Sequence, residues 1–249
     1  MRVIAWFTAA VMLTACTGNP GTPAEVGNAR LVVFAAASLN GAFSEVGREF
    51  EAAHPGVRIT FSFDGSAALV DQLKQGAPAD VFAAADRPTM AKATAAGLIA
   101  GTPEQFTSNL LTLVVPTGNP AHITGLDSSL DGKKLVTCAD EVPCGSATAK
   151  LATLVGVILH PVSEETKVTD VRAKVESGQA DAGVVYVTDA LASGDLVESV
   201  AIQRADQVRN DYLIAVTGSA SAPGLADEFV AAVKGSRGQA VLAAAGFGP

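Results

Sequence analysis

The stretch "LVVFAAASLNGAF", residues 31–43, joins a strand pattern to a helix pattern through a single serine. Residues 31–37 form a continuous apolar run, which is typical of a buried parallel strand, and residues 40–54 carry apolar side chains at helical spacing. A strand that ends at Ser38 and leads directly into a helix directs a hydroxyl and unpaired backbone N–H groups to one point. The stretch therefore predicts an α/β unit, and it leaves three roles open for Ser38: nucleophile, phosphate site or site for a free anion.

The same alternation continues to the end of the chain. Further strands are predicted at residues 55–63, 79–85, 109–116, 133–138, 181–187 and 212–217. Helical spacing lies between several of these runs and again over residues 226–245. Strands that alternate with helices predict an α/β fold with largely parallel sheets.

The composition favours a folded body with a large core and no nucleic-acid partner. The chain has 249 residues, of which 49% are hydrophobic and 17% charged, and its formal net charge is −8. No run of lysine or arginine offers the basic patch that nucleic-acid binding requires. Downstream of the first residues, no stretch reaches the roughly 18 apolar residues of a membrane span.

Residues 1–15 have the pattern of an export signal. Arg2 precedes the apolar run 3–15, which has the length of a signal-peptide core. The sequence "LTAC", residues 13–16, resembles a bacterial lipobox, which implies cleavage before Cys16 and lipid attached to that cysteine; the alternative is an ordinary secretory signal. Residues 16–30 are rich in glycine, proline and threonine and predict a flexible tether. We therefore expect an exported protein, anchored by lipid at the extracytoplasmic face of the cell membrane.

The two remaining cysteines lie close together. Cys138 and Cys144 stand in "TCADEVPCGS", residues 137–146. In an exported protein such a pair favours a disulfide. The C-x5-C spacing is not a common zinc pattern, and no histidine lies nearby, so a metal site is the weaker alternative.

The local motifs argue against catalysis and against a nucleotide. Ser38 lacks the G-x-S-x-G context of a nucleophile elbow, and the three histidines show no motif that would make one of them its base. Neither glycine-rich phosphate-loop pattern occurs. Ser66, which follows "FSFDG" at residues 61–65, repeats the strand–serine–helix arrangement. Two serines at two helix N-termini can hold an oxyanion without a cation, although helix capping alone is the ordinary role of serine there.

Four segments resemble one family. They are "VFAAASL" at 33–39, "FDGSAALVDQL" at 63–73, "GAPADVFAAAD" at 76–86 and "ADAGVVY" at 180–186. In this order they resemble the periplasmic molybdate-binding proteins of molybdate ABC transporters, from about residue 31 to residue 246. The resemblance implies a periplasmic-binding-protein-like fold, with two α/β lobes joined by two crossover strands and a ligand cleft between them. It implies lobe I at 31–112 plus 217–249 and lobe II at 113–216, with crossovers near 109–115 and 212–217.

The resemblance also implies ligand contacts and a role. The implied contacts are the hydroxyls of Ser38, Ser66 and Tyr186 and the backbone N–H groups of Cys144 and Val168, with Val171 as the alternative to Val168. They would hold molybdate or tungstate, a metal bound as its oxyanion, for delivery to an ABC transporter permease. We expect a monomer that is not an enzyme and needs no cofactor. Asp64, two residues before Ser66, is expected to point away from an oxyanion or to cap a helix.

Three alternatives remain open. The same fold could bind another ligand, such as sulfate, phosphate or an iron–oxyanion complex, for which a tyrosine cluster or a cationic side chain in the cleft would speak. The chain could instead be an exported hydrolase, or a structural lipoprotein without a ligand.

Overall fold

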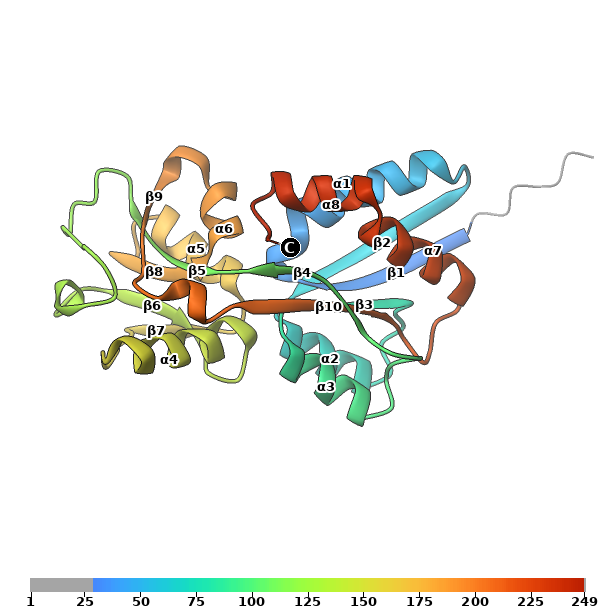
Figure 1. Ribbon diagram of the computed structural model, residues 1–249, viewed down its shortest axis with the longest axis horizontal. Helices are drawn as coiled ribbons and strands as arrows, with labels where there is room; N and C mark the ends of the chain where they lie inside the picture. Colours follow the sequence, from blue (N-terminus) through green and yellow to red (C-terminus); the bar gives the residue numbers. More distant parts are fainter. Residues whose placement is uncertain (1–28, 249) are drawn as a thin grey trace, which may run out of the picture.

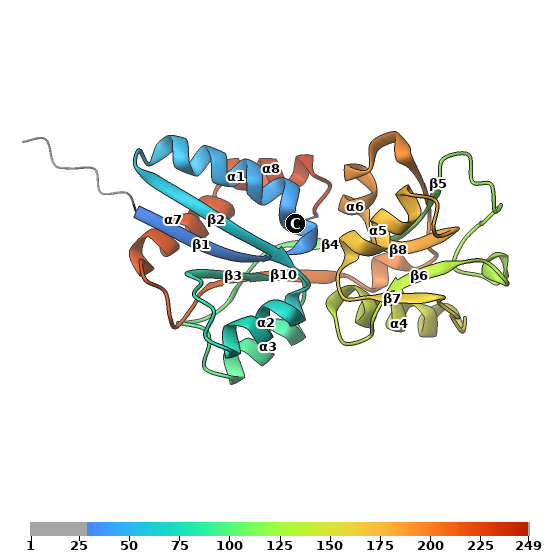
Figure 2. The same ribbon diagram turned by 180° about the vertical axis from the view of Figure 1, so that it is seen from behind.

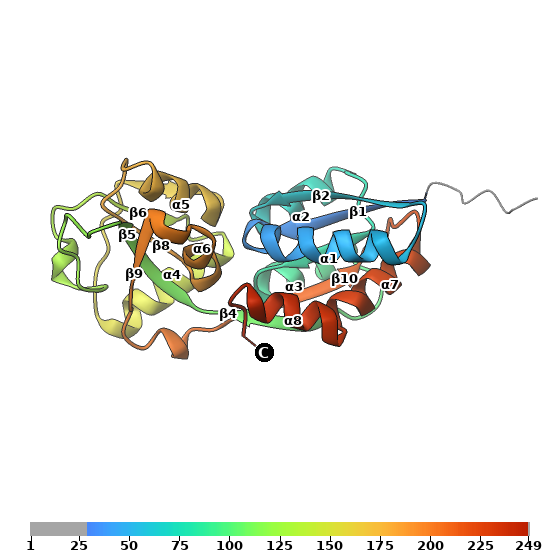
Figure 3. The ribbon, with the colours of Figure 1, turned by 90° about the horizontal axis from the view of Figure 1, so that it is seen from above.

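The computed structural model describes residues 29–248, and these form two lobes that lie side by side (Figure 1, Figure 3). Each lobe contains one five-stranded sheet with helices on both faces. The predicted two-lobed α/β fold is therefore confirmed. The predicted signal peptide, Cys16 and the tether as far as residue 28 lie outside the described residues. Within 29–248, no helix combines the length and the apolar character that crossing a bilayer demands.

Lobe I is built on a sheet of strand order β2-β1-β3-β10-β4. β1 runs parallel to β2 and β3, whereas β10 is antiparallel to β3 and β4. Helices α1, α7 and α8 cover one face and α2 and α3 the other (Figure 1, Figure 2). The strands are β1 (Ala29–Ala36), β2 (Val57–Asp64), β3 (Val81–Ala84), β4 (Glu104–Asn109) and β10 (Asn210–Val216). The helices are α1 (Asn40–Ala53), α2 (Ser66–Lys74), α3 (Arg87–Ala95), α7 (Pro223–Lys234) and α8 (Ser236–Ala244).

Lobe II repeats the plan with the order β7-β6-β8-β5-β9. β6 is parallel to β7 and β8, and β5 is antiparallel to β8 and β9. Helix α4 covers one face, and α5 and α6 the other (Figure 1). The strands are β5 (Leu111–Pro116), β6 (Leu135–Cys138), β7 (Ser163–Glu165), β8 (Ala182–Tyr186) and β9 (Val197–Val200). The helices are α4 (Pro143–Val155), α5 (Val168–Glu176) and α6 (Val187–Ala192).

The sheets correct the predicted lobe boundaries. The chain crosses between lobes at Leu110 and again over residues 201–209. Residues 210–216 belong to lobe I, because β10 pairs with β3 and β4. Residues 111–112, predicted in lobe I, pair with β8 in lobe II. Residues 29–30, predicted in the tether, begin β1 because they pair with β2.

Helix α1 shows how the sequence pattern becomes packing. Its buried face includes Ala42, Phe43, Val46 and Phe50, as the spacing predicts, whereas Ala53 in the last turn is exposed. The Phe43 ring meets those of three other phenylalanines, from β2, β4 and α7, at centroid distances of 5.7–6.4 Å. Burial of these rings supplies a large apolar area, which stabilises the contact between α1, α7 and the sheet.

Asp80 fastens the far end of the first sheet. Its carboxylate is buried and accepts hydrogen bonds from the Val32 N–H at 2.7 Å, from the Ser221 N–H at 2.7 Å and hydroxyl at 2.9 Å, and from the Ala222 N–H at 3.3 Å. Burial tends to raise the pKa of Asp80, but these hydrogen bonds outweigh it, so the pKa is lowered. The ionised carboxylate thus joins β1 to the segment that begins α7.

We expect Asp80→Asn to lower the free energy of unfolding by about 1–3 kcal/mol, because the amide N–H2 must face a backbone N–H. Since the folded pKa lies below the unfolded value of about 3.9, the native advantage is fully present above that pH. It is lost as the pH falls through the folded pKa. Urea unfolding from pH 7 to pH 3 measures both effects. Asp71→Asn on the surface of α2 is the matched control; an equal, pH-independent loss in both variants would contradict the assignment.

Candidate functional site

The six parallel strands deliver six short segments to one cavity between the lobes. In α/β sheets, ligands bind outside the carboxyl ends of the strands, where helices begin. Here β1, β2 and β3 end toward lobe II, and the chain that follows β6, β7 and β8 faces them. The cavity is lined by residues 36–38, 64–66, 85, 142–144, 166–168 and 186. Each segment follows, or ends, one of those six strands.

The cavity is small. The space open to the centre of a water molecule is about 20 Å³. A cavity needs roughly 10–15 Å³ by that measure to hold one water, and pockets for drug-sized ligands are typically about 300–1,000 Å³. The site therefore fits an ion of a few atoms and not an organic molecule of metabolite size.

Ser38 lies in the 3-10 turn Ala37–Leu39 that links β1 to α1. Its side chain is partly buried, and its Oγ lies 2.8 Å from the Oη of Tyr212 on β10. The strand–serine–helix pattern thus places the hydroxyl at the cavity, as predicted. The pattern gave no sign of Tyr212, because the partner is 174 residues away in the sequence.

Ser66 is the first residue of α2, and Gly65 precedes it as the N-cap. Its side chain is buried, and its Oγ accepts a hydrogen bond from the Ala85 N–H at 3.1 Å. Because a backbone N–H can only donate, the Ser66 proton is left to point elsewhere. Ser66 is therefore not the cap of its own helix: its hydroxyl accepts a bond from the residue that follows β3, and the residue lines the cavity.

Cys144 and Val168 bring backbone donors from lobe II. Cys144 is the second residue of α4, and Val168 is the first residue of α5. N–H groups in the first turn of a helix have no partner within the helix, so these groups can serve a ligand. Val171, the alternative to Val168, is buried against Gly183 of β8 and does not line the cavity.

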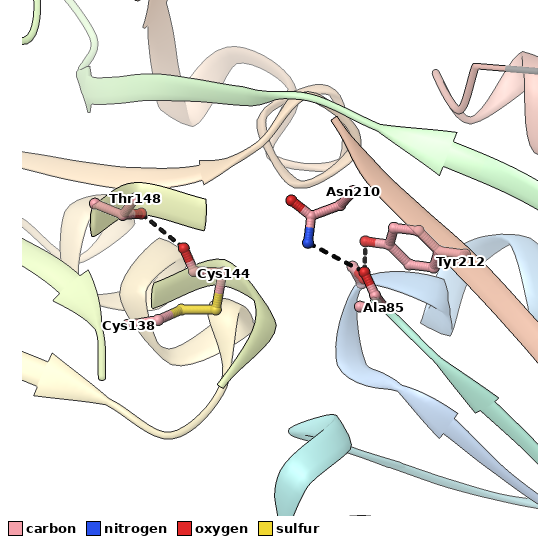
Figure 4. Close-up of a disulfide and its surroundings, with 7 residues drawn as sticks. Ala85, Cys138, Cys144, Thr148, Asn210 and Tyr212 are labelled. Carbon is pink, nitrogen blue, oxygen red and sulfur yellow. Dashed lines mark hydrogen bonds between the residues drawn. A yellow bond between two sulfur atoms is a disulfide. The ribbon is translucent and has the colours of Figure 1, made fainter. Parts of the chain in front are cut away.

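The predicted disulfide is present beside this loop. Cys138, the last residue of β6, is bonded to Cys144 with a Cα–Cα distance of 5.7 Å (Figure 4). The Thr148 hydroxyl donates to the Cys144 carbonyl at 2.7 Å. The first turn of α4 is therefore held covalently to the end of β6, and the Cys144 N–H keeps a fixed place relative to the sheet.

Tyr186 ends β8 and is the N-cap of α6. Its hydroxyl is buried and, within residues 29–248, has no hydrogen-bond partner. Burial raises the pKa of Tyr186 well above its usual range, and the neighbouring Tyr212 and Asp86 add to the effect. The phenol therefore keeps its proton at neutral pH. A buried hydroxyl without a partner is costly, so this group favours an acceptor in the cavity.

Two charged residues on the cavity wall were not expected there. Asp64 was predicted to point away or to cap a helix; it lines the cavity, and its carboxylate accepts from the Gly65 N–H at 2.8 Å and from Gln72 at 3.4 Å. Lys167, which the sequence analysis did not single out, is the N-cap of α5 and pairs with Asp170 at 3.9 Å. Each charge is thus partly engaged by its own lobe.

The chemistry of the site is hydrogen-bond donation to an anion. Helices α2, α4, α5 and α6 all begin at the cavity, and a helix N-terminus carries a partial positive charge of about half a unit. No histidine lines the cavity, so neither serine has an imidazole base within reach among the described residues. No group of three or more His, Cys, Asp or Glu residues suited to a bare metal ion occurs within 29–248.

Two solved structures share this fold. The periplasmic molybdate-binding protein of Azotobacter vinelandii gives a TM-score of 0.76 at 21% identity, covering 87% of this chain and 98% of that one. The sulfate-binding protein SubI of Mycobacterium tuberculosis gives 0.72 at 23% identity, covering 88% and 86%. These likenesses show the fold alone, and their two named ligands differ.

Sequence similarity defines the family. The molybdate-binding protein ModA of Mycobacterium tuberculosis is 46% identical over 241 residues, which cover 94% of this chain and 92% of the relative. The family model described as bacterial extracellular solute-binding protein matches residues 31–248. This chain therefore belongs to the bacterial extracellular solute-binding protein family.

Proposed function

We propose that this protein captures molybdate, and also tungstate, outside the cytoplasm and delivers it to the permease of an ABC transporter. The observation that carries the proposal is the interlobe cavity, where three hydroxyls, two backbone N–H groups and four helix N-termini converge on space for one small ion. The 46% identical mycobacterial relative, named as a molybdate-binding protein, supports this choice of ligand.

The donor set suits an anion that carries no proton. A fully deprotonated tetrahedral dianion only accepts hydrogen bonds, and hydrogen bonds to a charged acceptor are about twice as strong as neutral ones. The hydroxyls of Ser38, Ser66 and Tyr186 and the N–H groups of Cys144 and Val168 would all donate. The helix N-termini supply the attraction, because the protein as a whole carries a formal net charge of −8.

Asp64 is compatible with a second class of ligand, the protonated oxyanions. Its carboxylate lies on the cavity wall, and a carboxylate oxygen can accept the proton of a protonated oxyanion such as hydrogen phosphate. Both of its oxygens already accept bonds from lobe I, which favours the molybdate proposal. Sulfate has the charge and shape of molybdate in a smaller ion, so cavity size is the feature that would separate the two.

The ligand is expected to stabilise the protein. The thermal unfolding of residues 24–249 is measured with and without molybdate, tungstate, sulfate and phosphate. Calorimetry is used to monitor unfolding, because the only tryptophan, Trp6, is absent from that chain and gives no fluorescence signal. At about one hundred times its dissociation constant a ligand adds roughly 2.7 kcal/mol, which shifts the melting temperature by several degrees. Molybdate and tungstate should produce this shift and sulfate should not.

Ser38→Ala and Ser66→Ala should each weaken molybdate binding about tenfold to a hundredfold, because each removes a hydrogen bond to a charged acceptor. Ser44→Ala is the matched control, since Ser44 lies on α1 away from the cavity and bonds only Asn40. A rise of the melting temperature with sulfate or phosphate, and none with molybdate, would mean that the site binds an anion other than molybdate. The absence of any shift would refute the proposed function.

Closure of the lobes has a specific steric requirement at Gly65. A Cβ atom at this position would lie 2.2 Å from the Thr166 carbonyl oxygen and 3.7 Å from the Lys167 Cβ, and both residues belong to lobe II. The backbone of Gly65 has φ −57° and ψ 133°, which any residue adopts. A side chain here is therefore compatible with lobe I by itself and incompatible with the observed contact between the lobes.

We expect the lobes to stand apart without ligand, so Gly65→Ala should leave the melting temperature of the ligand-free protein nearly unchanged. It should weaken molybdate binding at least tenfold, because binding brings the lobes together. Titration calorimetry measures the affinity, and X-ray scattering measures whether ligand still makes the protein more compact. Gly41→Ala is the control, because a Cβ there meets nothing within 4 Å. Unchanged affinity in Gly65→Ala would mean that binding does not need this approach of the lobes.

Cys16 is the proposed site of lipid attachment, on the strength of the "LTAC" sequence alone. In the full-length chain expressed in a bacterial host, the protein should sediment with membranes and release on addition of detergent. Cys16→Ala should move it to the soluble fraction or leave it unprocessed. Cys138→Ala, which keeps Cys16, is the control; membrane association that survives Cys16→Ala with a processed N-terminus would exclude the lipid anchor.

A further inference from the structure

We propose that Tyr212 is a positioning residue for the anion site: its hydroxyl donates to Ser38 and thereby aims the Ser38 proton into the cavity. The inference rests on the proposed function, since it concerns how the same site holds an oxyanion. Tyr212 itself does not line the cavity.

A short hydrogen bond links Tyr212 to Ser38, and the Tyr212 hydroxyl also interacts with Asn109 and Tyr186. Tyr212 Oη lies 2.8 Å from Ser38 Oγ, and Tyr212 is completely buried. Its ring packs in T-shaped contacts against three aromatic rings. The centroid distances are 6.4 Å to Phe106, 6.0 Å to Tyr186 and 5.4 Å to Phe247. The ring is therefore fixed by packing from both lobes, and its hydroxyl has little freedom to turn away from Ser38.

The direction of the bond follows from the ligand. Each hydroxyl has one proton, and distance alone does not say which of the two donates. Burial raises the pKa of Tyr212 well above its usual range, so the phenol remains protonated at any physiological pH. If Ser38 donated to Tyr212, the Ser38 lone pairs would face an anion and repel it. With Tyr212 as donor, Ser38 is free to donate to the anion, and both bonds are made.

Ser66 also accepts a hydrogen bond from within lobe I, and its donor is a backbone N–H, which cannot act as an acceptor. The Ala85 N–H donates to Ser66 Oγ at 3.1 Å. The Ala85 carbonyl accepts from the Asn210 side chain at 3.1 Å (Figure 4). Asn210 and Tyr212 are two residues apart on β10 and so share one face of the strand. One face of β10 therefore supports both serines, through the Ala85 peptide for Ser66 and directly for Ser38.

This arrangement changes what the serines can accept. A free hydroxyl can serve either as a donor or as an acceptor, so it does not by itself reject a protonated anion. A hydroxyl that accepts a bond from an internal donor keeps its own proton for the cavity, together with one lone pair. The two internal donors thus leave both serine protons for the cavity, which favours anions without a proton.

The test is a double-mutant cycle on the soluble chain, residues 24–249, with Tyr212→Phe, Ser38→Ala and the double variant. Phenylalanine keeps the ring and its edge contacts and removes only the hydroxyl. We expect Tyr212→Phe to weaken molybdate binding about threefold to tenfold in the wild-type background. In the Ser38→Ala background its effect on the dissociation constant should be much smaller, because the route through Ser38 is gone.

Tyr186→Phe is the matched control, because the chain has only two tyrosines and Tyr186 is proposed to contact the ligand itself. Its effect should persist in the Ser38→Ala background. An equal loss from Tyr212→Phe in both backgrounds, or no loss in either, would overturn the positioning role. Failure of the proposed function is visible earlier, since the wild-type protein would then bind no oxyanion. If sulfate or phosphate is the ligand instead, the same cycle is run with that anion and decides the question equally.

Discussion

The convergence of helix N-termini on one cavity is the constraint on which the rest of the structure depends. A protein with a net negative charge has no long-range attraction for an anion, so the attraction must come from groups at close range, namely helix dipoles and Lys167 on the cavity wall. That requires four helices, α2, α4, α5 and α6, to begin at the same place. Helices begin at one place only if the strands before them end there. The three parallel strands of each sheet meet this condition, and the repeated plan of the lobes follows from it.

The tight approach of the lobes depends on residues without functional groups as much as on the donors. Gly65 meets the Thr166 carbonyl so closely that no side chain fits between them. Near the crossover at Leu110, Gly248 pairs with Ser108 through two backbone hydrogen bonds of 2.9 and 3.0 Å. The neighbouring Gly246 lies against Leu191 of α6, so the C-terminal segment also spans the two lobes. The positions of the donors at the cavity therefore depend on these close contacts between the lobes.

Local patterns predicted most of the architecture, and long-range pairing decided the rest. All five proposed ligand residues line one cavity, but Cys144, Val168 and Tyr186 were named from the family resemblance. Val168 follows β7, whose sequence "SEE" has no apolar run and was not predicted as a strand. β4 was not predicted, because its sequence "EQFTSN" shows little apolar character. The lobe to which β10 belongs was predicted wrongly, since "YLIAV" is equally apolar whichever sheet it joins. Tyr212 was seen as a strand residue only; no local motif reveals a hydroxyl partner 174 residues away.

The division of the donors between lobes bears on release as well as capture. Ser38 and Ser66 stand on lobe I, whereas Cys144, Val168 and Tyr186 stand on lobe II. An anion between them completes its coordination only while the lobes are together, so opening removes about half of its partners in one movement. The five proposed partners are neutral groups, and Lys167 of lobe II, the cation on the cavity wall, is paired with Asp170. A site built on a buried arginine would bind as well and would let go less readily, since a charged pair keeps its attraction on one side of the cleft. Neutral donors shared by two lobes therefore suit a protein that must bind tightly and then hand its ligand on.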